Sequence, residues 1–137
     1  MDRFTKVSDS GLLLAATEPE WVAVLDTRTN LMWPVAETRR MTYAKALEYP
    51  KKLATAGFED WRLPTVEELF LLADRTRYSP AIDTAFFQKA KSDWYWSSTV
   101  DASSPSDYAW LVGFSHGYSS WYDQSHEGFV RAVRSSQ

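Results

Sequence analysis

The sequence predicts a single α+β domain in which two helices pack on a twisted, mostly antiparallel sheet. The 137 residues are enough for one domain with its own core. Helical signals are confined to residues 42–73, and short strand-like runs bounded by turn residues lie before and after them. Aromatic residues make up 15% of the chain, and most Trp and Tyr residues lie from Trp94 onward, which indicates a β-rich second half.

The first third of the chain is expected to contribute strands. Apolar stretches at residues 11–16 and 20–25 are bounded by turn-forming residues. The polar run 26–30 lies between the second stretch and residues 31–33, so it predicts the turn of a hairpin. Pro34 then ends the strand.

A first helix is expected after Thr42, which suits an N-cap position. Apolar residues recur at helical spacing up to residue 54, and Gly57 suits the position that follows a helix end. Pro50 lies inside this pattern and lacks the backbone donor that a helix interior needs. We therefore expect a kink or a break near Tyr49.

A second helix is predicted by the clearest local signal in the sequence. Thr65 at the N-cap and Glu68 three residues later form a capping box, in which each side chain satisfies a backbone N–H of the first turn. Leu69, Leu72 and Ala73 supply an apolar face, and the polar segment 74–80 ends the helix.

The second half of the chain is predicted to be antiparallel sheet. Ser115, His116 and Gly117 form a three-residue connection with Gly last, which is a common hairpin pattern. The polar segment 100–107 is expected to be a loop. Strands are expected at residues 94–99, 108–114, 118–123 and 129–134.

Composition excludes several functional classes. The chain contains no Cys, which excludes disulfides, thiolate zinc sites and cysteine nucleophiles. Its net charge is −3 with scattered Lys and Arg, so no nucleic-acid partner is expected. The longest apolar run, residues 11–16, is too short for a membrane span or a signal-peptide core. We therefore expect a cytoplasmic protein with no membrane span.

Five separated blocks of the sequence carry a resemblance to a known family. The blocks are Asp26-Thr27 with Leu31-Met32-Trp33, Asp60 to Thr65 with Glu68, Trp96-Ser97-Ser98-Thr99, Phe114 with Gly117, and Val130-Arg131-Ala132-Val133-Arg134. In this order, over residues 21–134, they resemble the Lcl C-terminal-like family, a domain of unknown function. The whole chain, residues 1–137, is thus expected to be one such domain.

The resemblance implies a fold similar to C-type lectins and to the formylglycine-generating sulfatase modifiers. It also implies a binding surface more than a catalytic site, and some relatives resemble extracellular carbohydrate- or matrix-binding modules. The calcium motifs of true C-type lectins, Glu-Pro-Asn and Trp-Asn-Asp, are missing, so no lectin mechanism carries over.

The motif Asp60-Trp61-Arg62 has two interpretations. It could clamp a ligand beside an aromatic platform, or Trp61 could fill the core while Asp60 and Arg62 pair with backbone groups before the capped helix. Because the motif adjoins a helix start, we favour the structural interpretation. We extend a structural role to the other motif residues, which are Thr65, Glu68, Trp96, Ser97, Ser98, Arg131 and Arg134.

Catalytic and metal-binding readings are less favoured. His116, His126 and Asp123 could bind a metal or move a proton, but both histidines fall in expected turns. The serines lack the Gly-x-Ser-x-Gly elbow of a serine hydrolase. Asp101, Asp107 and Asp123 have the oxygen ligands that calcium prefers, but no motif spacing. We predict no catalytic residues, no metal and no cofactor.

The aromatic residues of the second half are the expected binding surface. Trp and Tyr combine a large rigid contact area with a polar tip, and neighbours such as Trp121 and Tyr122 point to opposite faces of a strand. The predicted partner-binding residues are Tyr95, Tyr108, Trp110, His116, Tyr118, Trp121, Tyr122 and Asp123.

The sequence therefore favours a non-enzymatic module that recognises a protein partner. A small protein of this kind suits an inhibitor from a phage or mobile element that targets a host complex. A carbohydrate- or matrix-binding module of the cell envelope is the main alternative, because Trp and Tyr also stack on sugars. An enzyme that uses His116, His126 and Asp123 is the third.

Overall fold

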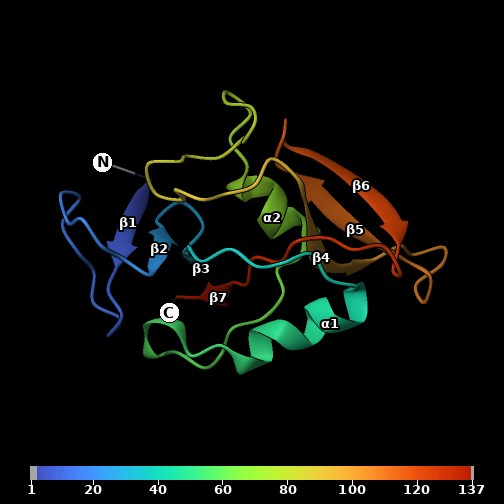
Figure 1. The fold of residues 1–137 in the computed structure, drawn as a ribbon, viewed down its shortest axis with the longest axis horizontal. Helices are drawn as coiled ribbons and strands as arrows, with labels where there is room; N and C mark the ends of the chain where they lie inside the picture. The colour runs from blue at the N-terminus through green and yellow to red at the C-terminus, as the bar shows by residue number, and fades with distance from the viewer. Residues whose placement is uncertain (1–2, 137) are drawn as a thin grey trace.

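The protein contains two antiparallel sheets and two α-helices within residues 3–136, the part of the chain that the computed structural model describes (Figure 1). One sheet has the order β1-β2-β3-β7 and the other the order β4-β5-β6. This arrangement confirms the predicted α+β class, but the strands form two sheets where a single one was expected. No helix in this part of the chain is long and apolar enough to cross a bilayer.

The first sheet begins earlier than predicted. Strand β1 (Phe4–Val7) pairs with β2 (Ala23–Asp26), which pairs in turn with β3 (Leu31–Pro34). The strand expected at residues 11–16 is wrong, because this segment is a loop that touches β1 through one isolated bridge to Val7. Leu12 and Leu13 stay exposed, so this segment buries little apolar area through its contact with β1.

The first helical region breaks where Pro50 predicts. Helix α1 (Tyr43–Glu48) is followed at once by a 3₁₀ helix, η1 (Tyr49–Lys52), and then by a short turn, η2 (Thr55–Gly57). Pro50 lies in the first turn of η1, where its missing N–H costs no helical hydrogen bond. Thr42 is the N-cap of α1, as predicted, although its side chain makes no capping hydrogen bond.

Helix α2 (Val66–Leu72) begins at the predicted capping box. The Glu68 backbone N–H donates to Thr65 Oγ1 at 3.2 Å, and the Thr65 backbone N–H donates to Glu68 Oε1 at 2.9 Å. Leu69 and Leu72 are buried against both sheets in the largest core cluster, which also contains Trp33, Phe87 and Tyr95. The helix is thus held at its start by polar bonds and along one face by packing.

The second sheet follows the predicted hairpin closely. Strands β4 (Trp94–Val100), β5 (Tyr108–Gly113) and β6 (Tyr118–Asp123) are consecutive neighbours. The β5–β6 register runs from Tyr108 opposite Asp123 to Gly113 opposite Tyr118. The turn contains Gly117 at φ +87°, a conformation that favours glycine.

The last segment differs from the predicted strand 129–134. Only β7 (Arg134–Ser135) joins a ladder, beside β3. Isolated bridges connect Gly128 to Met41, Phe129 to Tyr95 and Val133 to Arg62. This segment, the red trace that crosses the centre of Figure 1, therefore connects both sheets and the α1–α2 region.

Candidate functional site

Strand β6 forms an exposed edge of the second sheet. Within residues 3–136 it pairs with β5 only, and no further strand covers its other side. The side chains of Tyr118, Trp121 and Tyr122 are 67%, 53% and 41% exposed. An edge strand with large exposed aromatic side chains is unusual, because native proteins normally protect such edges with charge, proline or a covering segment.

The exposed aromatic side chains lie on both faces of the sheet. Trp121 lies opposite Trp110, and their ring centroids are 5.4 Å apart. The neighbouring residue Tyr122 points to the other face, where its ring contacts Trp94 at 5.9 Å. We call the sheet β4-β5-β6 with these exposed rings the aromatic sheet. Tyr108, at the start of β5, is also exposed on it.

Tyr95 does not belong to this surface, so its predicted role in partner binding is wrong. Only 1% of the residue is exposed, and its ring packs against Phe114 and Phe129. Its hydroxyl donates to Glu37 Oε1 at 2.5 Å, and burial raises the pKa of the phenol. Strand alternation turns Tyr95 toward the core cluster that also contains Val112 of β5.

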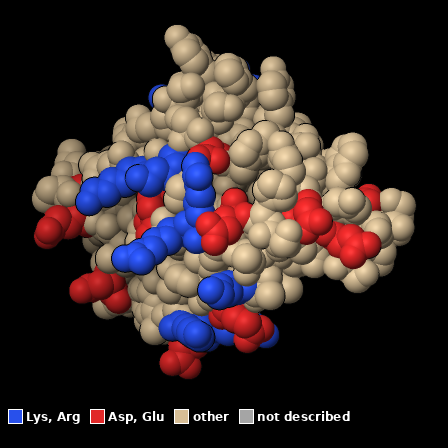
Figure 2. Space-filling model, turned by 45° about the vertical axis from the view of Figure 1, so that its right-hand side comes forward, with Lys and Arg blue, Asp and Glu red and all other residues tan. Residues whose placement is uncertain are grey.

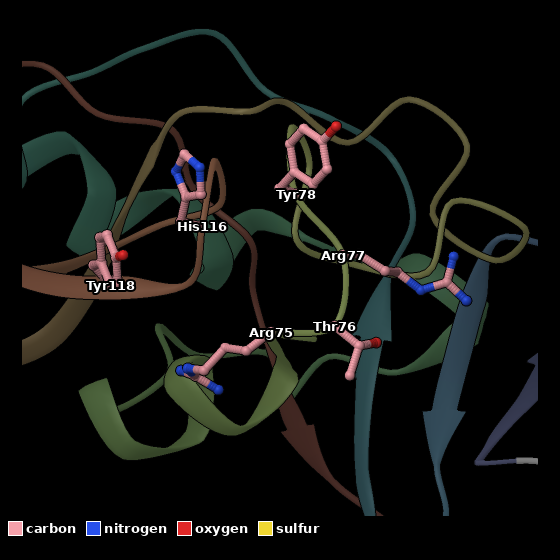
Figure 3. Close-up of a pocket in the computed structure, with 6 residues that line it drawn as sticks. All are labelled: Arg75, Thr76, Arg77, Tyr78, His116 and Tyr118. Carbon is pink, nitrogen blue, oxygen red and sulfur yellow. The ribbon is translucent and has the colours of Figure 1, made fainter.

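A small pocket lies at the turn end of β6. His116 stacks between Tyr78 and Tyr118, with ring centroids 6.2 and 5.8 Å away. The pocket has a volume of about 440 Å³ and is completed by Arg75, Thr76 and Arg77. Figure 3 shows that Arg77 points away from His116 and Tyr118. The predicted residues His116 and Tyr118 are thus brought together with the loop 75–78, which no sequence pattern marks as part of a site.

Arg75 is the cation at this end of β6. Its Nη2 donates to the Phe70 carbonyl oxygen at 3.0 Å, and its guanidinium lies 3.5 Å from the Phe70 ring centroid. In the part of the chain that the structure describes, no carboxylate lies within ion-pair distance of Arg75. Its stem lies so close to Gly117 that a Cβ there would be 3.1 Å from Arg75 Cγ. No sequence signal predicts this long-range contact.

The opposite end of β6 is acidic. Asp123 Oδ1 accepts hydrogen bonds from the Ser125 backbone N–H at 2.8 Å and from Ser125 Oγ at 2.7 Å. These bonds lower the pKa of the Asp123 carboxyl. Asp107 lies next to Tyr108, whose partner across the ladder is Asp123, and Glu127 is exposed nearby.

The two histidines are not brought together. His116 stacks on Tyr118, whereas the ring of His126 lies 5.3 Å from Tyr122. The two tyrosines are four positions apart along β6, which corresponds to about 13 Å. Asp123 therefore has one histidine at its own end of β6 and the other at the far end of the strand.

The loop carboxylates proposed as calcium ligands each have a local partner. Asp101 accepts from Ser103, and Asp107 accepts from Ser104. Among residues 3–136 no group of three or more acidic or histidine side chains is placed to hold a metal ion.

The Asp60-Trp61-Arg62 motif is engaged in structural contacts. Trp61 is buried and its Nε1 donates to the Thr55 carbonyl oxygen at 3.2 Å. Arg62 pairs with backbone groups of Val133, as expected, whereas the Asp60 and Arg62 side chains also form ion pairs. Arg134 Nε donates to Asp60 Oδ1 at 2.7 Å, and the Arg62 guanidinium makes a bidentate pair with Glu68.

Glu68, which pairs with Arg62, connects the Asp60-Trp61-Arg62 motif to α2. Burial raises the pKa of Glu68, but hydrogen bonds from Arg62 and Thr65 outweigh it, so the net effect is a lowered pKa. The Arg134 hydrogen bond lowers the pKa of Asp60 in the same way. Both carboxylates therefore stay ionised at neutral pH and are bound to arginine.

The Trp96-Ser97-Ser98 block is structural as well. Trp96 is buried and its Nε1 donates to the Met41 carbonyl oxygen at 2.9 Å. Ser97 is also buried, and its Oγ donates to the Trp110 carbonyl oxygen at 2.7 Å. The Ser98 backbone N–H donates to the Pro64 carbonyl oxygen at 2.7 Å. These bonds fix β4 against β5 and the α2 start.

Arg131 is the most buried charged side chain of the motif set. Its Nη1 donates to the Pro34 carbonyl oxygen at 2.7 Å, and its Nη2 forms an ion pair with Glu37. Its guanidinium also lies 4.9 Å from the Phe87 ring centroid. The side chain therefore joins the C-terminal segment to the chain that leaves β3.

A larger groove lies away from the aromatic sheet. It has a volume of about 980 Å³ and is bounded by the loop before β2, the η2 turn and residues 86–89. Lys6 contacts two of the lining residues: its Nζ donates to the carbonyl oxygens of Ala16 and Glu18 and lies 4.0 Å from the Trp21 ring centroid. No local sequence pattern predicts this groove, because segments far apart in the chain form it.

These observations define an α+β protein whose two antiparallel sheets share a C-terminal connecting segment and whose second sheet exposes an aromatic edge. The family profile of the Lcl C-terminal domain matches residues 22–134, and the chain belongs to that family. The match confirms the resemblance seen in the five sequence blocks. A comparison with curated proteins finds no match.

Proposed function

We propose that this protein is a non-enzymatic binding module that recognises a protein partner through the aromatic sheet. The observation that carries this proposal is the exposure of β6, whose aromatic side chains lie open to solvent on both faces. Burial of such side chains dominates the free energy of many protein interfaces. Their polar tips also keep a free surface soluble.

The charge distribution supports the same proposal. Residues 108–122 contain no Asp, Glu, Lys or Arg. In the view of Figure 2, charged side chains lie across the left, the centre and the bottom, whereas the upper part is almost free of them. Depletion of charge at the centre and a charged rim are typical of protein interfaces.

A protein partner is favoured over a carbohydrate by the state of the polar groups beside the rings. Sugar binding needs free side-chain amides and carboxylates next to an aromatic platform. The Gln124 amide already donates to the carbonyl oxygens of Pro105 and Tyr108, and Asp123 accepts from Ser125. The catalytic alternative is disfavoured because His116 and His126 lie at opposite ends of β6.

The cellular setting belongs to the same proposal. A chain without Cys suits a reducing compartment, so we place the interaction in the cytoplasm. We further propose that the module inhibits a host complex on behalf of a phage or mobile element.

The test is affinity capture from a lysate of the producing cell and, for a phage protein, of its host. The bait is the full chain. The variant is Trp110→Ala/Tyr118→Ala, which removes one ring from each face of the aromatic sheet. The matched control is Leu12→Ala/Leu13→Ala, which removes exposed apolar side chains from the loop before β2. Thermal unfolding checks that all three proteins are folded.

We expect wild type and the control to retain the same protein at a fixed stoichiometry, and the aromatic variant to lose it. Equal retention by all three proteins would contradict the assignment to the aromatic sheet. If no protein is retained by wild type, the proposal fails, and a polysaccharide array becomes the test of the carbohydrate alternative.

A further inference from the structure

We propose that two copies of this chain pair antiparallel along β6, so that their aromatic sheets join into one continuous sheet. The proposal concerns the backbone edge of the strand, whereas the proposed function concerns side chains on the sheet faces. Its test needs no partner from the cell, so the two proposals fail independently.

The unpaired backbone groups of β6 can be assigned from its ladder with β5. The Gln124 backbone N–H donates to the Asp107 carbonyl oxygen at 2.8 Å, which makes these two residues a hydrogen-bonded pair. Hydrogen-bonded and non-hydrogen-bonded pairs alternate along an antiparallel ladder. Ser119 and Trp121, which lie opposite Val112 and Trp110, therefore direct their backbone N–H and C=O groups away from β5.

These outward groups match a second copy in one symmetric register. A twofold axis perpendicular to the sheet, midway between the Ser120 residues of the two copies, places Ser119 opposite Trp121 of the second copy. Both residues present outward N–H and C=O groups, so each such pair exchanges both of its hydrogen bonds. The same axis places Tyr118 opposite Tyr122 of the second copy, in the closer, non-hydrogen-bonded pairing that favours aromatic contacts.

The charges at the two ends of β6 favour this occupant. Arg75 packs on Gly117 at the turn end, and Asp123 is the last residue at the other end. In the register that places the two Ser120 residues opposite each other, Gly117 of one copy lies opposite Asp123 of the second copy. At each of the two symmetric positions, the Arg75 guanidinium of one copy therefore lies at the Asp123 end of the other copy's β6. Residues 118–122, between these two ends, carry no charge.

The test is sedimentation of the full chain over a wide concentration range. We expect a reversible equilibrium between a 15.7 kDa monomer and a species of twice that mass. Ser119→Pro removes an outward backbone N–H and no β5–β6 hydrogen bond, so it should leave the monomer folded and abolish the dimer. A wild type that stays monomeric at the highest concentration overturns the proposal.

Four further variants protect the test against a folding defect in the proline variant. Ser120→Lys places like charges opposite each other at the twofold axis and should also abolish the dimer. Arg75→Glu and Asp123→Lys should each weaken dimerisation about tenfold, and the double variant Arg75→Glu/Asp123→Lys should restore it. A dimer that survives both Ser119→Pro and Ser120→Lys, or a double variant weaker than either single one, refutes this pairing.

Discussion

The buried ion pair between Arg131 and Glu37 should be the most sensitive polar contact in the protein. Arg131 and Glu37 side chains are 2% and 9% exposed, and Glu37 also accepts the Tyr95 hydroxyl. Glu37→Gln keeps the side-chain shape but removes the charge that balances the buried guanidinium. Loss of one partner from a buried pair costs about 3–5 kcal/mol. The free energy of unfolding of a chain this long is roughly 7–20 kcal/mol, so the loss is large.

The matched comparison is Asp60→Asn, which removes the carboxylate from the Arg134 pair. The Asp60 side chain is 61% exposed, so solvent replaces the lost interaction and the expected cost is about 0–1 kcal/mol. Urea denaturation followed by Trp fluorescence gives both values, and thermal scans should show a fall in Tm of about 10–20 °C for Glu37→Gln. Equal losses for the two variants, or a loss below about 1 kcal/mol for Glu37→Gln, would refute the reasoning.

The remaining predictions concern the capping box and the β5–β6 turn. Because the folded-state pKa of Glu68 is lowered, its contribution to stability is present above its ordinary pKa near 4.5 and is lost as the pH falls through the folded value. Between about pH 5 and pH 3, the free energy of unfolding should therefore fall less for Glu68→Gln than for wild type. The same pH dependence for both proteins would contradict this role of Glu68. Gly117→Ala forces a Cβ into a positive-φ position and against Arg75 Cγ, so it should cost about 1–2 kcal/mol in urea denaturation. Gly57→Ala, which meets no atom within 4 Å, measures the backbone cost alone.

The sequence predicts well those elements that are determined by local chemistry. The capping box places the start of α2, Pro50 places the break after α1, and Gly117 places the β5–β6 turn. In each case the deciding interaction lies within a few residues of the signal. The five sequence blocks then indicate the correct family, whose profile matches residues 22–134.

The errors arise where distant segments decide the structure. Residues 11–16 have strand-like composition, but no neighbouring strand covers them, and Leu12 and Leu13 stay in solvent. Residues 128–133 make isolated bridges to three different segments and do not follow one ladder. A pattern of residues cannot show which partner a strand will find.

The candidate site shows the same division. Alternation along β6 predicts that Trp121 and Tyr122 face opposite sides, and the structure shows both exposed. Tyr95 also lies in an aromatic-rich strand, but its side chain is buried in the core. Arg75 reaches the site only through the packing of the loop after α2 on Gly117, which no local pattern encodes.

The C-terminal connecting segment has a consequence for the order of folding. The β2–β3 and β5–β6 hairpins each close a few residues of chain, so they can form early and independently. The β3–β7 pairing and the Arg62 to Val133 bridge join residues about a hundred and about seventy positions apart, and closing such long loops is slow. The two sheets should therefore gain their fixed relative orientation only in the last step, when residues 128–135 settle between them.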